Sequence, residues 1–204
     1  PDMGKHANGL LGEYFVVRDI GGIGTGDTYP YGLEEGNLKT TQIEDDINYR
    51  SFDDLLQERT GQADNAGVRW TGYIQPEQTG DYLFMAKSDD GCMLYIDGEK
   101  VIDYWKAHDG SGVYAEKRVH LEKGKQYAFQ CEYLEYKGGA RMQLFWSAGE
   151  KFDQENVPPS VFYLPDGVKP PVQSPAQTVE ISTQNGQTCV AGSETTLQFT
   201  AAVT

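Results

Sequence analysis

Hydrophobic runs are short throughout the sequence. No stretch approaches the roughly 20 apolar residues that a transmembrane helix needs, so we expect no membrane insertion. No signal peptide is visible, and the first residue is Pro1. We therefore expect the chain to be a piece of a larger protein.

Histidine is scarce, and with it the usual partner of a catalytic nucleophile. The histidines are His6, His108 and His120, and no G-x-S-x-G elbow occurs. Carboxylate pairs of the kind used in glycoside hydrolysis exist in any acidic chain, and none here has supporting context. We expect a non-catalytic accessory module, whose parent protein could be a glycoside hydrolase.

Cysteine is also rare. Cys92, Cys131 and Cys189 match no zinc or C-x-x-C spacing. Cys92 and Cys131 lie inside apolar runs, which favours buried free thiols. The alternative is a disulfide between these two if their strands are neighbours, which would leave Cys189 without a partner.

Positive charge is in deficit. The chain has 17 Lys and Arg against 31 Asp and Glu, a net charge of -14. Such a surface repels phosphate backbones and anionic membranes, so nucleic acid is not an expected partner. Loops that gather carboxylates do suit a hard cation. For most of the acidic residues, solubility is the simpler explanation.

What the sequence has in abundance is glycine and large flat side chains, with 24 Gly and 13 Tyr. Strand patterns cover 81–87 and 92–96, and the turn Asp97-Gly98 joins the second to a returning strand at 100–105. Only 51–59 has a helical pattern, with Ser51 as a candidate cap. These features predict an all-β protein, an antiparallel β-sandwich of jelly-roll type.

The chain divides by composition into four parts. Residues 1–8 are predicted to be a disordered leader, and 9–164 the β-sandwich. Four prolines make 165–176 a stiff linker. Strand patterns return in 177–204, which is too short to close a second sandwich.

Several motifs occur in order along the sandwich. They are Glu13-Tyr14-Phe15, Val68-Arg69-Trp70-Thr71-Gly72, Ser88-Asp89-Asp90-Gly91, Tyr95-Ile96-Asp97-Gly98 and Leu144-Phe145-Trp146. In this combination the sequence over 9–164 resembles the protective-antigen (PA-14) domain. The resemblance implies an extracellular or cell-surface location in an exported bacterial protein, as in adhesins, toxins and glycoside hydrolases. The stretch 192–202 resembles the opening of a group-2 bacterial immunoglobulin-like domain.

The pair Asp89-Asp90 is the candidate metal site. In the sugar-binding members of the family the two aspartates are joined by a cis peptide, and both bind one Ca²⁺ that also ligates sugar hydroxyls. An Asn on a later loop completes the site in flocculins, but the corresponding loop 134–139 has none. We expect Glu135, or backbone carbonyls near Tyr136 and Lys137, to replace it. The alternative is a turn of two solvated aspartates without metal.

Four further residues are candidate glycan contacts: Trp105, His108, Tyr136 and Lys137. Trp105 could offer a ring on which a sugar face stacks. The simpler interpretation is that Trp105 belongs to the edge of the core. His108 could flank the aspartates, and Lys137 could donate to a sugar hydroxyl or be an exposed hairpin charge.

Two functions are therefore expected, and calcium distinguishes them. The first is a monomeric carbohydrate-binding module that holds a glycan or polysaccharide through Ca²⁺ at Asp89-Asp90. The second is a structural spacer or protein-interaction module in which the two aspartates only shape a turn.

Overall fold

The computed structural model describes residues 6–17, 32–107, 115, 117–148, 154–170, 180–182 and 188–190. The chain forms two compact units, Pro1–Lys169 and Pro170–Thr204, so the boundary falls inside the predicted linker. Within the described ranges, no helix is long and apolar enough to cross a membrane.

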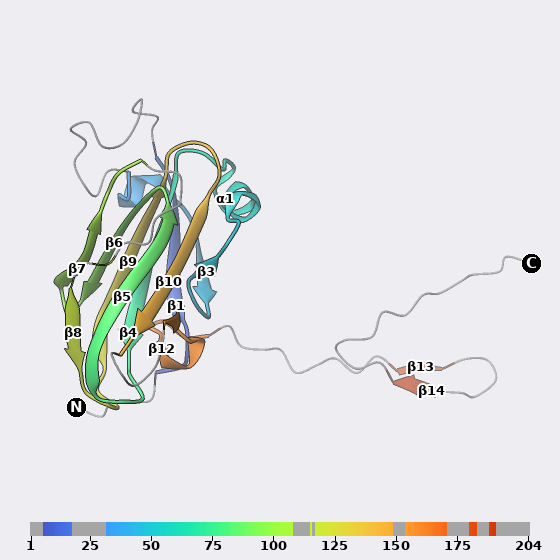
Figure 1. Ribbon diagram of the computed structural model, residues 1–204. Coiled ribbons are helices and arrows are strands. Elements are labelled where there is room, and N and C mark those ends of the chain that lie inside the picture. Colours follow the sequence, from blue (N-terminus) through green and yellow to red (C-terminus); the bar gives the residue numbers. More distant parts are fainter. Residues whose placement is uncertain are drawn as a thin grey trace, which may run out of the picture. The chain divides into compact units, whose positions relative to one another are not determined.

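The first unit contains two antiparallel sheets (Figure 1). The larger sheet has seven strands, in the order β2 (Leu38–Glu44), β1 (Leu10–Val16), β4 (Ala66–Ile74), β9 (Tyr127–Glu135), β6 (Gly91–Ile96) and β7 (Glu99–Tyr104), with β12 (Phe162–Tyr163) paired to β4. The smaller has five, in the order β11 (Glu155–Asn156), β10 (Arg141–Ser147), β5 (Gly80–Asp89) and β8 (Arg118–Leu121), with β3 (Asn48–Tyr49) paired to β10. This arrangement confirms the predicted all-β sandwich.

Helices are few in the described residues. They are α1 (Asp53–Thr60) and the short 3-10 turns η1 (Glu35–Asn37) and η2 (Pro159–Val161). The prediction of Ser51 as the cap of α1 is wrong, since Phe52 holds that position without a side-chain cap. Phe52 is fully buried, so core packing fixes where this helix begins. In the second unit, β13 (Glu180–Ser182) pairs with β14 (Thr188–Val190).

Large aromatic side chains fill the space between the sheets. Strand alternation turns Trp70 inward from β4 and Phe84 inward from β5, and both are 0% exposed. The rings of Tyr49, Phe52 and Trp70 all pack against one another, with 4.1 Å between the Tyr49 and Phe52 centroids and about 6 Å from each of these to Trp70. The core therefore rests on aromatic contacts between the two sheets.

The hairpin predicted at Asp97-Gly98 is present. β6 ends at Ile96 and β7 begins at Glu99, so two residues connect them. Both have positive φ, 49° at Asp97 and 76° at Gly98, as a tight hairpin turn requires.

One buried carboxylate ties four strands and the helix together. Glu44 on β2 is 6% exposed. It accepts hydrogen bonds from the Tyr14 hydroxyl at 2.8 Å, from Trp70 Nε1 at 2.7 Å and from the Tyr49 hydroxyl at 2.5 Å. Arg59 Nη1 from α1 forms an ion pair with the same carboxylate. This "Glu44 hub" satisfies a buried charge with donors from four elements, as burial of a charge demands.

The first and last chain segments of the sandwich lie side by side. The Gly9 amide donates to the Phe162 carbonyl at 3.1 Å, and the Leu164 amide donates to the Ala7 carbonyl at 2.8 Å. Asn8 forms a β-bridge with Tyr163. The predicted disordered leader 1–8 is thus too long, because Ala7 and Asn8 find backbone partners in the chain that leaves the sandwich.

Cys92 and Cys131 are both buried free thiols on the neighbouring strands β6 and β9, as the apolar runs around them predicted. Burial raises the pKa of the Cys131 thiol well above its ordinary value. We expect neither thiol to react with iodoacetamide in the folded protein, and both to react in denaturant. Peptide mapping by mass spectrometry would measure this. Labelling of Cys131 at equal rates in both states would contradict the prediction.

Candidate metal centre

The loop that carries the two aspartates joins the two sheets. β5 of the smaller sheet ends at Asp89 and β6 of the larger begins at Gly91, so Asp90 alone connects them. The peptide bond between Asp89 and Asp90 is cis, as the resemblance implied. A Cβ added at Gly91 would lie 3.4 Å from the Cα and ring atoms of Trp105, so Trp105 packs directly against this loop.

Glu135 reaches the same point from the last position of β9. Asp89, Asp90 and Glu135 each offer a carboxylate oxygen within 4.8 Å of the others. Asp90 is 3% exposed and Glu135 is 0% exposed. Burial, and then the charge of Asp90 beside it, raises the pKa of Glu135 to about 9. Three carboxylates are thus crowded into a space where their negative charges disfavour one another.

Hydrogen bonds orient the carboxylates of Asp90 and Glu135 and hold the backbone at Asp89. The backbone amide of Tyr136 donates to Asp90 Oδ2 at 2.8 Å. The Tyr133 hydroxyl contacts the Asp89 carbonyl oxygen and lies 3.0 Å from Glu135 Oε2. Since a hydroxyl has one proton, it can donate to only one of these acceptors at a time.

One buried oxygen of this cluster lacks a protein partner. Among the residues that the structure describes, Glu135 Oε1 is buried and accepts no hydrogen bond. A buried acceptor without a partner is costly unless something else binds it. The cluster offers only oxygen ligands, which suit hard cations such as Ca²⁺ and lack the nitrogen or sulfur typical of zinc sites. The residues present therefore fit a calcium ion.

The other predicted site residues lie around this cluster in different ways. Trp105 and the half-buried Tyr136 pack on a small hydrophobic cluster at the edge of the core, which agrees with the simpler place considered for Trp105. Lys137 is exposed, with its Nζ 5.0 Å from the centre of the Tyr136 ring. His108 lies outside the described residues.

Two residues near the cluster were not predicted. Asp64 precedes β4, accepts a hydrogen bond from the Gly138 amide at 3.2 Å, and adds a small electrostatic contribution to the raised pKa of Glu135. The ring of Tyr133 is buried in the core, and its hydroxyl reaches the loop at Asp89. Its place two residues before Glu135 puts both on one face of β9, which is the signal that could have identified it.

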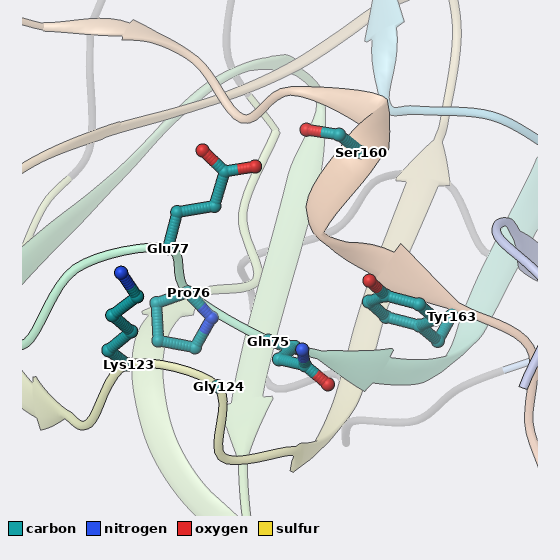
Figure 2. A pocket seen from close by; sticks show the side chains of 7 residues that line it. All are labelled: Gln75, Pro76, Glu77, Lys123, Gly124, Ser160 and Tyr163. Carbon is teal, nitrogen blue, oxygen red and sulfur yellow. The ribbon is translucent and has the colours of Figure 1, made fainter. Parts of the chain in front are cut away.

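A separate hollow lies at the other end of β5. It has a volume of about 350 Å³, and Figure 2 shows its lining. The residues are Gln75, Pro76, Glu77, Lys123, Gly124, Ser160 and Tyr163. Since Gln75–Glu77 lie between the end of β4 and the start of β5, this hollow is not part of the carboxylate cluster.

Known proteins resemble this chain over the sandwich. Anti-sigma-I factor RsgI3 of Acetivibrio thermocellus is 30% identical over 155 residues, which make up 76% of this chain and 23% of that protein. A solved structure of an anti-sigma factor domain-containing protein has a TM-score of 0.65 and 29% identity, over 82% of this chain and 50% of that one. The chain therefore spans at most half of these relatives.

A further solved structure is the Epithelial Adhesin 6 A domain of Candida glabrata in complex with Galb1-3GlcNAc. It has a TM-score of 0.62 and 16% identity, over 83% of this chain and 92% of that one. Identity this low establishes the fold and nothing more.

Residues 8–155 match the sequence model of the PA14 domain family. The match ends before the segment 177–204, whose predicted immunoglobulin-like character is left without support. It covers the carboxylate cluster and both sheets up to the start of β11, with the cis bond and the motif order that the resemblance implied. The chain belongs to the PA14 domain family.

Proposed function

We propose that this chain is a non-catalytic module that binds glycans through calcium, in a protein that acts outside the cell or on its surface. The observation that carries the proposal is the cluster of Asp89, Asp90 and Glu135, with its buried oxygen that accepts no hydrogen bond from the described residues. The fold is shared with an adhesin domain solved with a bound disaccharide, so a glycan is a ligand that this fold can accommodate.

The three carboxylates would hold the ion, and the surrounding residues would keep them in place. Ca²⁺ takes 6–8 oxygen ligands, and one oxygen from each of the three carboxylates supplies three of them. When bound, the ion offers its remaining positions to carbonyls, water or two adjacent sugar hydroxyls. The Tyr136 amide fixes one oxygen of Asp90, and the Tyr133 hydroxyl fixes the position of Glu135.

A glycan array tests this proposal. We expect binding in about 1 mM calcium, the range of extracellular calcium modules, and loss of binding in excess chelator. Return of the signal when calcium is added back is the control for irreversible damage. Equal binding with and without chelator would contradict a role for the ion, and an array without any bound glycan would favour the spacer.

The relatives named as anti-sigma factors support a second candidate. In it, the module belongs to a longer anti-sigma factor and contributes to the contact of that protein with its sigma factor. The observation is the 30% identity to such a protein, of which this chain matches 23%. Calorimetric titration of the chain with a purified sigma factor would examine a direct contact. Measurable binding would favour a regulatory interface on the module itself over glycan recognition alone.

A further inference from the structure

Basic residues gather in one hollow on the outer face of the smaller sheet. The hollow has a volume of about 320 Å³ and is lined by Arg50, Lys87, Arg141, Gln143, Phe145 and Gln154. Lys87 stands on β5, and Arg141, Gln143 and Phe145 alternate outward along β10. We call these six residues the basic hollow. Three cations in one place are unusual in a chain with a net charge of -14.

The three cations are not used in ion pairs. Among the described residues, neither Arg50, Lys87 nor Arg141 has a carboxylate within the 4.0 Å that defines an ion pair. The close contacts between basic and acidic side chains in the described residues use other basic residues, namely His6, Arg59, Arg69, Lys100, Lys117, His120 and Lys125. Since like charges repel, a cluster of cations that form no ion pair is the arrangement expected of an anion site.

The hollow is ordered before any ligand enters. Arg141 Nε donates to the Arg50 carbonyl at 3.2 Å, which sets the orientation of the guanidinium. Gln143 lies directly across from Lys87 in the β5–β10 pair, and its Nε2 donates to Asn48 Oδ1 at 2.7 Å. A fixed guanidinium is suited to bind a carboxylate through two parallel hydrogen bonds.

The basic hollow adjoins the carboxylate cluster. Lys87 lies two residues before Asp89 on β5, and Arg141 is the partner of Asp89 on β10. A polymer held at the loop between the sheets could therefore continue along the face of the smaller sheet.

We propose that the basic hollow binds the carboxylates of an acidic polysaccharide, one built from uronic acid residues. The inference rests on the proposed glycan binding and names its class of ligand, but it does not require calcium. The lining matches what a uronate presents, because guanidinium and ammonium groups meet its carboxylate, amides meet its hydroxyls, and the Phe145 ring meets its C–H face. The carboxylate of Asp89 lies beside the basic hollow, because Asp89 pairs with Arg141, and it opposes anion binding there. Negative charges farther than about 8 Å act weakly, since physiological salt screens them.

Binding of the chain to polygalacturonate in EDTA tests the proposal, measured by isothermal calorimetry or by affinity electrophoresis. We expect binding to polygalacturonate and none to its fully methyl-esterified form, which has the same backbone without charge. Arg141→Gln should weaken binding about tenfold, the effect of losing one charge-assisted hydrogen-bonded contact. Arg50→Gln should weaken binding to the same extent. This second variant keeps the hydrogen bond from Arg141 to the Arg50 backbone carbonyl, so it still tests the proposal if Arg141→Gln fails to fold.

The matched control is Arg118→Gln, which makes the same change of charge on β8 outside the basic hollow. It should leave binding unchanged. Equal weakening by all three variants, or equal binding of the methyl ester, would overturn the proposal. The two proposals fail separately, because uronate binding in EDTA does not depend on calcium. Loss of this binding while a calcium-dependent glycan signal persists would refute only the basic hollow.

Discussion

Replacing Asp90 with asparagine should weaken calcium binding at least about 100-fold. Loss of a residue that only supports a metal ligand costs 10- to 100-fold in affinity, so loss of a direct carboxylate should reach at least the upper end of that range. Asp90→Asn keeps the size of the side chain and the oxygen that accepts from the Tyr136 amide. The change therefore removes charge with little change of shape.

Calorimetric titration with calcium measures this effect, and Asp54→Asn is the matched control. Asp54 is exposed in the first turn of α1 and away from the cluster, so the same chemical change there should leave the affinity unaltered. Glu135→Gln should resemble Asp90→Asn, because it removes the other buried carboxylate. Wild-type affinity in both cluster variants would mean that calcium binds elsewhere, and no binding by the wild type at millimolar calcium would leave the aspartates as a turn only.

Replacing Glu44 with alanine should lower the free energy of unfolding by about 3–5 kcal/mol, the cost of removing one partner of a buried ion pair. The substitution leaves Arg59 and the buried donors of Tyr14, Tyr49 and Trp70 without their shared acceptor. Because small domains are stable by only about 5–15 kcal/mol, much of the total would be lost. Glu44→Gln keeps one acceptor oxygen and should cost less.

Urea unfolding followed by tryptophan fluorescence gives these free energies, since Trp70 belongs to the Glu44 hub. Glu58→Ala is the matched control, because Glu58 is exposed on α1 and a surface substitution should change stability by less than about 0.5 kcal/mol. If Glu44→Ala cost no more than Glu58→Ala, the hub would not contribute to stability.

Much of the sandwich could be predicted because its central strands alternate strongly. β5 and β10 were recognisable from side chains such as Phe84 and Leu144, which are buried, and the turn at Asp97-Gly98 defined one hairpin. β2 escaped prediction because it is mostly polar, and six of its seven residues are exposed or only partly buried. Its importance lies in one buried carboxylate, Glu44, whose partners come from distant parts of the chain.

The candidate site was predictable only in its local part. Asp89 and Asp90 are adjacent, so a motif reveals them, and Glu135 was placed by the loop that follows β9. The basic hollow could not be found in this way, because Arg50, Lys87 and Arg141 are far apart in sequence and meet only through the pairing of β5 with β10. Charges that gather across strands need the sheet register to be known.

The meeting of the two ends of the sandwich has a mechanical consequence. Ala7 and Leu164 lie at the end of β4 that holds Ile74, whereas Ala66, at the opposite end, pairs with Glu135. The nine residues of β4 separate these ends by about 26 Å at the usual rise of a strand. If the sandwich is part of a longer chain, a pulling force along that chain would therefore enter and leave the sandwich at neighbouring points. A ligand at Asp89 and Asp90 would bind at the opposite end of the sandwich, outside the path of the force, so pulling would not deform its contacts.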